Sequence, residues 1–123
     1  MRILLADDEV LSNTALRAMI EEGGKYQVSY FFNGLDLCNS YEEQDDVGAV
    51  MLDFEMPHRN GIETAKWIRN YELSENKKRV PIIGITGHES NDVRTACINA
   101  GMDKVLSKPI YKKEILKVLN ELM

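Results

Sequence analysis

The chain has 123 residues, enough for one domain that buries roughly two-thirds of the surface its unfolded form exposes. Its net charge of -5 argues against a domain that binds nucleic acid through phosphate contacts. No apolar run approaches the roughly 20 residues that span a bilayer, and no basic and apolar leader opens the chain. We therefore expect a cytoplasmic protein with no direct contact to nucleic acid or membrane.

The first half of the chain alternates apolar strands with amphipathic helices. A first strand stops at three consecutive acids, Asp7, Asp8 and Glu9, and a helix with Leu16 turned inward ends at a pair of glycines. The apolar run before Asp53 is typical of a strand buried on both faces. The predicted elements are a strand at 2–6, a helix at 11–22, a strand at 27–32, a short helix after Asn33-Gly34, an acidic loop at 42–46 and a strand at 49–53.

The second half repeats the alternation. Asn60 and Glu63 have the spacing of a capping box and predict the start of a third helix. Pro81 opens the next strand, where a missing N–H costs least, and Ser90 can cap the helix after it. The predicted elements are a helix from Asn60, a polar loop at 73–79, a strand at 80–86, a helix with Val93, Ala96, Cys97 and Ala100 inward, a short strand at 105–106 and a helix that reaches the end of the chain.

Five strands that alternate with five helices predict a doubly wound α/β fold, in which helices cover both faces of a parallel sheet. In such folds a ligand binds outside the carboxyl ends of the strands, where the winding reverses. The two cysteines, Cys38 and Cys97, have no Cys or His nearby at metal-ligand spacing. We expect both to be small, reduced core residues.

Chemically useful side chains collect at the predicted carboxyl ends of the strands. They are Asp7 and Asp8 after the first strand, Asp53 after the third, Thr86 after the fourth and Lys108 after the fifth. Carboxylates packed together repel one another unless a cation intervenes, and an all-oxygen ligand set favours Mg²⁺ or Mn²⁺ over zinc. Lys108 and the hydroxyl of Thr86 suit the outer oxygens of a phosphoryl group, and Asp53 is then left as the nucleophile that forms an aspartyl phosphate.

The same residues lie in motifs that resemble the receiver domain of two-component response regulators. The resemblance covers the whole chain, 1–123, as one domain, and it is nearest to the receivers of hybrid histidine kinases. It implies a flavodoxin-like three-layer sandwich with strand order 2-1-3-4-5. The matching motifs are LLADDE at 4–9, MLDFEMP at 51–57 with Asn60-Gly61, Thr86-Gly87, AGMD at 100–103 and SKP at 107–109.

The resemblance also implies a mechanism. A phosphohistidine of a histidine kinase or histidine phosphotransfer domain would donate its phosphoryl group to Asp53. Asp8 and Asp53 would bind Mg²⁺ directly, Asp7 would bind it through water, and the main-chain carbonyl of Glu55 would complete the protein's ligands. Thr86 and Lys108 would contact the phosphoryl group and shift the region from the fourth strand to the last helix.

The chain departs from the family at the switch position, where many members carry Phe or Tyr and this chain has Val105. Valine has no ring to swing, which places the coupled threonine and aromatic switch in doubt. We further expect Glu55 and His88 to flank the path of water to the acyl phosphate and to tune its lifetime.

The family resemblance also indicates two partner surfaces. A kinase or phosphotransfer domain would dock on the helix that begins near Leu11, where Ala15 and Leu16 are the residues to vary. An unknown output partner would bind the last two helices and the strand between them. The domain could also be tethered as part of a membrane-bound hybrid kinase.

Three other functions compete with this interpretation. A small phosphatase would use Asp53 as its nucleophile and Glu55 as a second acid. A flavin carrier lacks its phosphate loop, because acids that repel phosphate follow the first strand. A receiver that only binds partners would not need the acids and the lysine. We expect a protein that catalyses only its own phosphorylation and dephosphorylation, and so no enzyme for external substrates.

Overall fold

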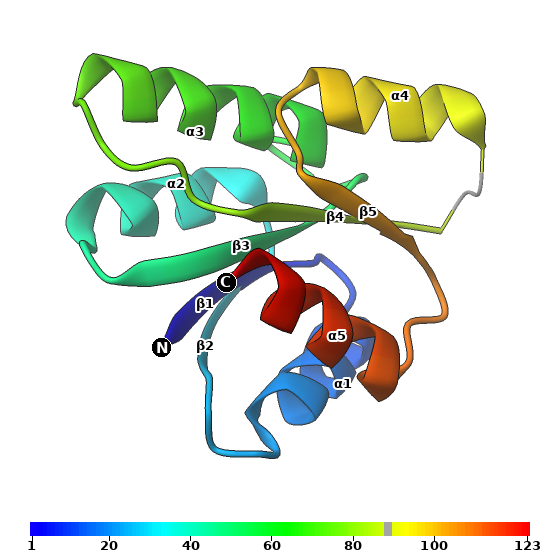
Figure 1. Cartoon of the computed structure of the whole chain (residues 1–123). Helices are drawn as coiled ribbons and strands as arrows, with labels where there is room; N and C mark the ends of the chain where they lie inside the picture. Colours follow the sequence, from blue (N-terminus) through cyan, green and yellow to red (C-terminus); the bar gives the residue numbers. More distant parts are fainter. Residues whose placement is uncertain (88–89) are drawn as a thin grey trace.

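The computed structural model describes residues 1–87 and 90–123. Strands and helices alternate strictly along it (Figure 1). None of the described helices combines the length and the apolar character that crossing a membrane requires. The elements are β1 (Arg2–Ala6), α1 (Val10–Glu21), β2 (Gln27–Phe31), α2 (Gly34–Glu43), β3 (Val47–Asp53), α3 (Gly61–Ser74), β4 (Ile82–Thr86), α4 (Asn91–Asn99), β5 (Lys104–Ser107) and α5 (Lys112–Leu122).

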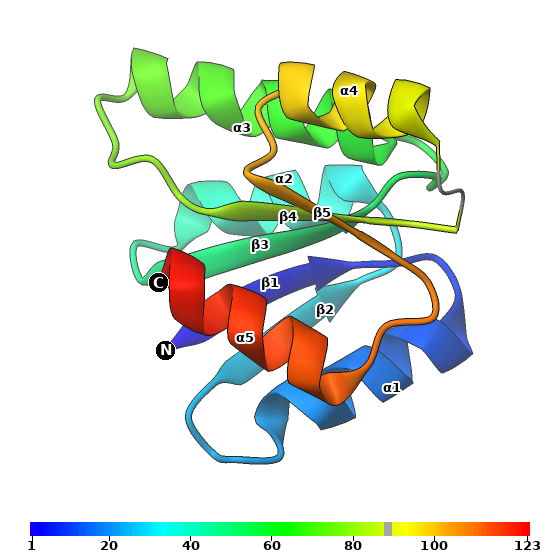
Figure 2. The same ribbon diagram turned by 45° about the vertical axis from the view of Figure 1, so that its right-hand side comes forward.

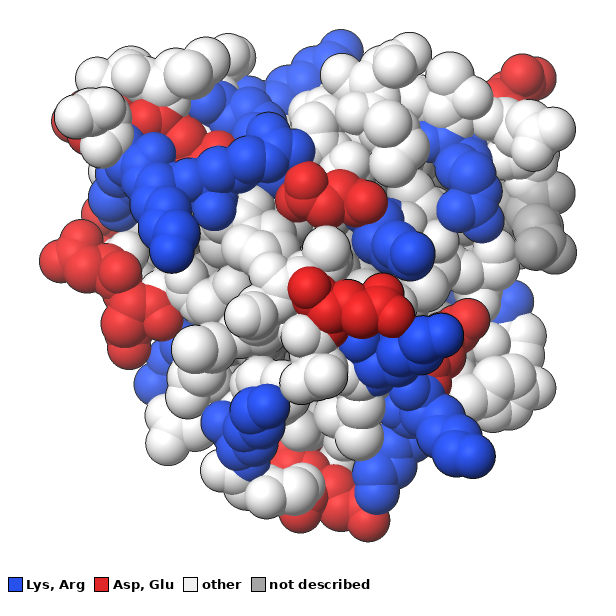
Figure 3. Space-filling model, viewed as in Figure 1, with Lys and Arg blue, Asp and Glu red and all other residues white. Residues whose placement is uncertain are grey.

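The five strands form one parallel sheet in the order β2-β1-β3-β4-β5. Helices α1 and α5 cover one face of this sheet, and α2, α3 and α4 cover the other (Figures 1 and 2). The predicted doubly wound fold, its three layers and the expected strand order are therefore confirmed. Acidic and basic side chains are interspersed on the face that carries α5 and β5 (Figure 3).

Alternate residues of each central strand feed two separate cores. On β1, Ile3 and Leu5 pack on the side of α1 and α5, whereas Leu4 and Ala6 pack on the side of α2 and α3. All four side chains are fully buried. A strand covered on both faces requires an unbroken apolar run, and such runs in the sequence predicted β1 and β3.

Several predicted boundaries and faces were wrong. The strand predicted at 80–86 begins at Ile82, because the N–H of Val80 donates to the Glu72 carboxylate at 2.6 Å and not to a neighbouring strand. The acidic loop is shorter than predicted, because α2 continues to Glu43. Ala96, predicted to face inward, is exposed, since α4 covers only the edge of the sheet and buries a narrow stripe. Cys38 and Cys97 are buried free thiols, as expected.

Arg69 of α3 holds together the end of the sheet that lies opposite the strand carboxyl ends. Its guanidinium donates to Glu72 at 2.7 Å, to Asp103 at 3.0 Å, and to the main-chain carbonyls of Val80 at 2.8 Å and Gly101 at 2.9 Å. Glu72 is only 5% exposed. This network ties α3 to the segment before β4 and to the turn before β5.

Candidate functional site

Three carboxylates meet where β1 and β3 end. Asp7 and Asp8 follow β1, Asp53 is the last residue of β3, and the two strands are neighbours in the sheet. One carboxylate oxygen of each acid lies within 4.8 Å of the other two. Asp7 is fully buried and Asp53 is 6% exposed, whereas Asp8 faces solvent. The fold therefore brings together the three acids that the sequence singled out.

The start of α1 fixes Asp7. One carboxylate oxygen of Asp7 accepts the main-chain N–H of Glu9 at 3.0 Å, and the other accepts the hydroxyl of Ser12 at 2.6 Å. The side-chain amide of Asn13 donates to the main-chain carbonyls of Asp7 at 3.2 Å and Phe31 at 3.1 Å. Neither Ser12 nor Asn13 was predicted from the sequence. A polar residue on the inward face of α1, in line with buried Leu16, was the available signal for Asn13.

Helix α3 begins directly against the end of β3. Asn60 and Glu63 form the predicted capping box, in which the Asn60 side chain accepts the N–H of Glu63 at 2.9 Å and the Glu63 carboxylate accepts the N–H of Asn60 at 3.1 Å. A Cβ added to Gly61 would stand 2.5 Å from the carbonyl oxygen of Asp53. Glycine is therefore needed at position 61 so that α3 can approach the site this closely.

Lys108 reaches the acids from the loop after β5. Its ammonium nitrogen lies 3.0 Å from Glu9, 3.4 Å from Asp7 and 3.5 Å from Asp53, measured to one carboxylate oxygen of each. Its main-chain N–H donates to the carbonyl of Thr86 at 2.8 Å, and the peptide bond to Pro109 is cis. The contact with Glu9 is the shortest of the three, and it was not predicted from the sequence.

The site carries more negative charge than Lys108 balances. Burial, and then the charge of Asp7, raise the pKa of Asp53 to about 7, although Lys108 acts in the opposite direction. Burial alone would lower the pKa of Lys108, but its hydrogen bond to Glu9 and the charges of Asp53 and Asp7 raise that pKa to about 12. A bound cation would relieve the repulsion among the acids.

A cleft of about 350 Å³ opens beside these groups. The side chains that could bind a metal ion there offer carboxylate oxygens, and no His or Cys is among the described residues that line the cleft. Such a donor set fits Mg²⁺ or Mn²⁺. The residues that line the cleft are Asp8, Glu9, Asp53, Phe54, Glu55, Thr86, Gly87 and Lys108.

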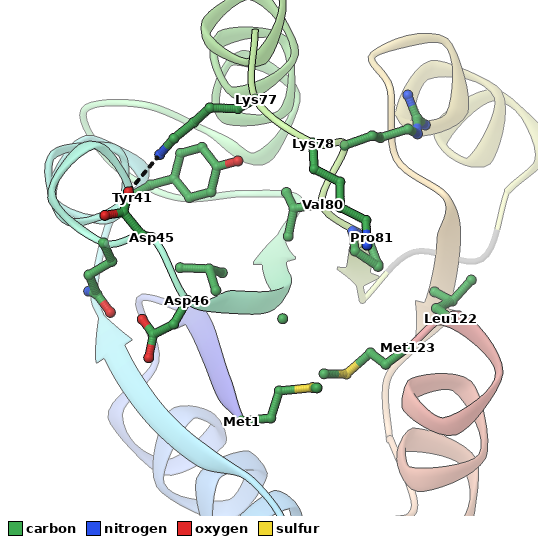
Figure 4. A pocket seen from close by; sticks show the side chains of 14 residues that line it. Met1, Tyr41, Asp45, Asp46, Lys77, Lys78, Val80, Pro81, Leu122 and Met123 are labelled. Atoms are coloured by element: carbon green, nitrogen blue, oxygen red, sulfur yellow. Dashed lines mark ion pairs between the residues drawn. The ribbon is translucent and has the colours of Figure 1, made fainter. Parts of the chain in front are cut away.

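A larger cavity, about 480 Å³, lies at the other end of the sheet, beside the amino ends of β3 and β4 (Figure 4). Its charged walls include Lys77 and Asp45, whose charged atoms are 3.8 Å apart. Met1 and Met123 lie on its apolar side. The residues that follow the carboxyl ends of the strands do not line this cavity. Because ligands of doubly wound folds bind at those carboxyl ends, the smaller cleft is the candidate site.

Thr86, Val105 and Glu55, which the sequence also singled out, lie outside the acid cluster. Thr86 ends β4 and is 3% exposed. Val105 pairs with Gly84 in the sheet and is buried in the core beneath α4, and its carbonyl accepts a hydrogen bond from Arg94 at 3.3 Å. Glu55 is exposed at the rim of the cleft. His88 lies outside the described residues.

One predicted docking residue was wrong. Leu16 is 3% exposed and packs in the core, so its side chain is not available to a partner. Ala15 is exposed, as are Val10 at 64% and Leu11 at 86%. The apolar surface of α1 therefore lies at its first turn, next to the acids.

Residues 3–120 match the family of response regulator receiver domains. A hybrid signal transduction histidine kinase of Dictyostelium discoideum is 29% identical over 98% of this chain, and an autoinducer sensor kinase/phosphatase of Vibrio cholerae is 32% identical over 94% of it. The chain spans only 7% and 16% of the lengths of these two relatives.

Solved structures are similar throughout the chain. The receiver domain of a Pseudomonas aeruginosa sensor histidine kinase is 30% identical, with a TM-score of 0.87 over 98% of this chain and 95% of that one, and it has a magnesium ion coordinated in its active-site cleft. The receiver domain of the Saccharomyces cerevisiae response regulator Ssk1, solved with the histidine phosphotransfer protein Ypd1, shares the fold at 22% identity, with a TM-score of 0.91 over 99% of this chain and 88% of that one. The chain belongs to the response regulator receiver domain family of two-component signalling.

Proposed function

We propose that this receiver accepts a phosphoryl group on Asp53 from a phosphohistidine, with Mg²⁺ or Mn²⁺ as cofactor. The observation that carries the proposal is the grouping of Asp53 with two further acids and Lys108 beside one cleft, at the end of the sheet where doubly wound folds bind ligands. The proposal treats residues 1–123 as a single receiver domain that modifies itself and turns over no external substrate.

The metal ligands would be the carboxylates of Asp8 and Asp53 and the main-chain carbonyl of Glu55. Asp7 would act through water, since both of its carboxylate oxygens already accept hydrogen bonds from protein groups. The divalent cation would neutralise the acids and polarise the phosphoryl oxygens. The magnesium ion reported for the Pseudomonas aeruginosa receiver supports this choice of cofactor.

In the reaction, a carboxylate oxygen of Asp53 would form a bond to phosphorus while the phosphorus–nitrogen bond of the donor breaks. The electron pair of that bond stays on the imidazole, which leaves as the neutral ring once protonated. Lys108 would neutralise an outer phosphoryl oxygen, because its ammonium already points at the Asp53 carboxylate. The Thr86 hydroxyl would donate to another such oxygen.

The bound phosphoryl group would then shift the region from β4 to α5. The main-chain hydrogen bond between Lys108 and Thr86 links the end of β4 to the loop after β5, so the two residues that would contact the phosphoryl group are already joined. Val105 stands at the family's aromatic switch position, but its β-branched side chain is restricted at χ1 and has no ring to reorient. Glu55 and His88 would tune the lifetime of the acyl phosphate by controlling the approach of water.

The phosphodonor would be a histidine kinase or a histidine phosphotransfer domain that docks on the first turn of α1. Exposed Val10 and Leu11 offer it apolar contacts near Asp53. The structure of a yeast receiver with its phosphotransfer protein supports this class of partner. The output partner would bind the α4–β5–α5 face. The domain would work in the cytoplasm, alone or tethered within a hybrid kinase.

Incubation with Mg²⁺ and acetyl phosphate, followed by intact-mass measurement, tests the proposal. We expect one labile phosphoryl adduct on the wild-type protein and none on the Asp53→Asn variant. The exposed Asp46, at the opposite end of β3, provides the control, and Asp46→Asn should be labelled normally. Absence of the wild-type adduct, or its survival in Asp53→Asn, would reject the proposal. Steady turnover of a simple phosphate ester would favour the phosphatase alternative.

A further inference from the structure

The ammonium of Lys108 is shared unevenly among three carboxylates. Its nearest carboxylate oxygen belongs to Glu9, at 3.0 Å, whereas those of Asp7 and Asp53 lie at 3.4 and 3.5 Å. Glu9 is 68% exposed at the mouth of the cleft, and the other two acids are buried. The shortest contact of the ammonium is therefore with the acid at the mouth of the cleft, although Asp53 remains within 3.5 Å.

We propose that Glu9 is a positioning residue that competes with the phosphoryl group for Lys108 and thereby slows phosphorylation of Asp53. The inference rests on the function proposed above. Before the Lys108 ammonium can neutralise an oxygen of the incoming phosphoryl group, it has to break its hydrogen bond to Glu9 or divide its N–H donors between Glu9 and that group. Glu9 lines the same cleft as Asp53 and Lys108, so the competition would take place where the phosphoryl group enters.

The local structure supports an interaction specific to Lys108. Glu9 occupies the N-cap position of α1, where a side-chain oxygen usually accepts an N–H of the first turn. Its side chain makes no such cap, and it bonds instead to a lysine 99 residues away in the sequence. The side chain of Glu9 therefore does not cap the helix, and a shorter residue such as Asp would cap it better.

Two substitutions separate the contact from the charge. Glu9→Gln removes the charge and keeps the length of the side chain. Glu9→Asp keeps the charge but is one methylene shorter, and its carboxylate is placed to cap α1 and no longer to reach Lys108. Glu22 forms a comparable pair with Lys112 at 2.7 Å at the far end of α1, so Glu22→Asp is the matched control.

The rate of Asp53 phosphorylation by acetyl phosphate at saturating Mg²⁺ is the readout. We expect both Glu9 variants to react about twofold to fivefold faster than the wild type, the range that the loss of an exposed lysine–carboxylate pair supports. Glu22→Asp should react at the wild-type rate. The ¹⁵N resonance of the Lys108 ammonium should shift in both Glu9 variants and stay unchanged in the control.

The outcomes are distinguishable. Equal or slower rates in the Glu9 variants would overturn the inference while leaving the proposed function intact. A faster Glu9→Gln with Glu9→Asp at the wild-type rate would also overturn it, because the net charge of the cleft would then account for the effect. An unlabelled wild-type protein would reject the proposed function itself.

Discussion

Replacement of Asp53 by asparagine should stabilise the metal-free protein at neutral and alkaline pH. Asp53 is 6% exposed, its carboxylate lies beside that of Asp7, and burial together with Asp7 raises its pKa from 3.8 to about 7. An ionised carboxylate in this position raises the free energy of the native state. Asparagine has nearly the same shape and carries no charge, so it removes the repulsion without leaving a cavity.

The magnitude follows from the pKa. A pKa of about 7 instead of 3.8 means that the native state binds this proton more tightly than the unfolded chain does. The free energy of unfolding therefore falls as the pH rises from about 4 to about 7, and at about 1.4 kcal/mol per pKa unit the total is about 4 kcal/mol. That pKa already includes the attraction of Lys108, so loss of this contact in the variant takes nothing further from the total. We expect Asp53→Asn to be more stable than the wild type by about 4 kcal/mol at pH 8 and by less than about 0.5 kcal/mol at pH 4.

Urea unfolding in the presence of a chelator, followed by circular dichroism at pH 4 and pH 8, measures both differences. Added Mg²⁺ should stabilise the wild type at pH 8 and narrow the gap to the variant, because the cation relieves the same repulsion. Asp46→Asn is the control and should change stability by no more than about 0.5 kcal/mol at either pH. A variant that is no more stable than the wild type at pH 8, or equally stabilised at both pH values, would refute the reasoning.

Three further substitutions test how the site and the opposite end of the sheet are built. Gly61→Ala should lower the free energy of unfolding in urea by about 1–3 kcal/mol, because the added Cβ meets a carbonyl oxygen of β3. Gly23→Ala is the control and should leave the urea stability unchanged, because the space around its Cβ is open. Ser12→Ala removes a hydrogen bond from the buried carboxylate of Asp7 and should cost about 1–3 kcal/mol; unchanged urea stability would show that the bond is not formed. Arg69→Met leaves the buried Glu72 without its cation, whereas Asp103 keeps its ion pair with Arg79 at 2.7 Å. The substitution should cost about 3–5 kcal/mol in thermal unfolding, and a loss below about 1 kcal/mol would contradict the assigned network.

The fold was predictable as far as burial determines it. Strands β1, β3 and β4 are covered on both faces, so their sequences are unbroken apolar runs, and the helices show the expected spacing of apolar residues. Alternation of strands and helices does not determine which strands are neighbours, and the order 2-1-3-4-5 came from the family resemblance. Segment boundaries failed where a side chain replaced a strand partner, as Glu72 does for the N–H of Val80.

The candidate site was predictable for a geometric reason. Parallel strands all end at one edge of the sheet, so residues that follow different strands must meet there, and Asp7, Asp53 and Lys108 do. Glu9 and Ser12 were missed because their roles depend on side-chain directions at the first turn of α1, which apolar periodicity does not describe. Both positions read as ordinary polar residues near a helix start.

The repulsion among the acids connects stability with function in this receiver. Buried carboxylates as close as those of Asp7 and Asp53 would not be retained in a core that served stability alone, since a neutral side chain of the same shape avoids their mutual repulsion. Lys108 offsets part of that repulsion, but it is divided among three carboxylates and neutralises none of them fully. A divalent cation would supply the missing positive charge, and the oxygens of an incoming phosphoryl group would give Lys108 a stronger partner than Glu9. Binding of the cation would then relieve the repulsion among the acids of the unmodified domain, and we expect the free energy released to favour a rearrangement of the loop after β5.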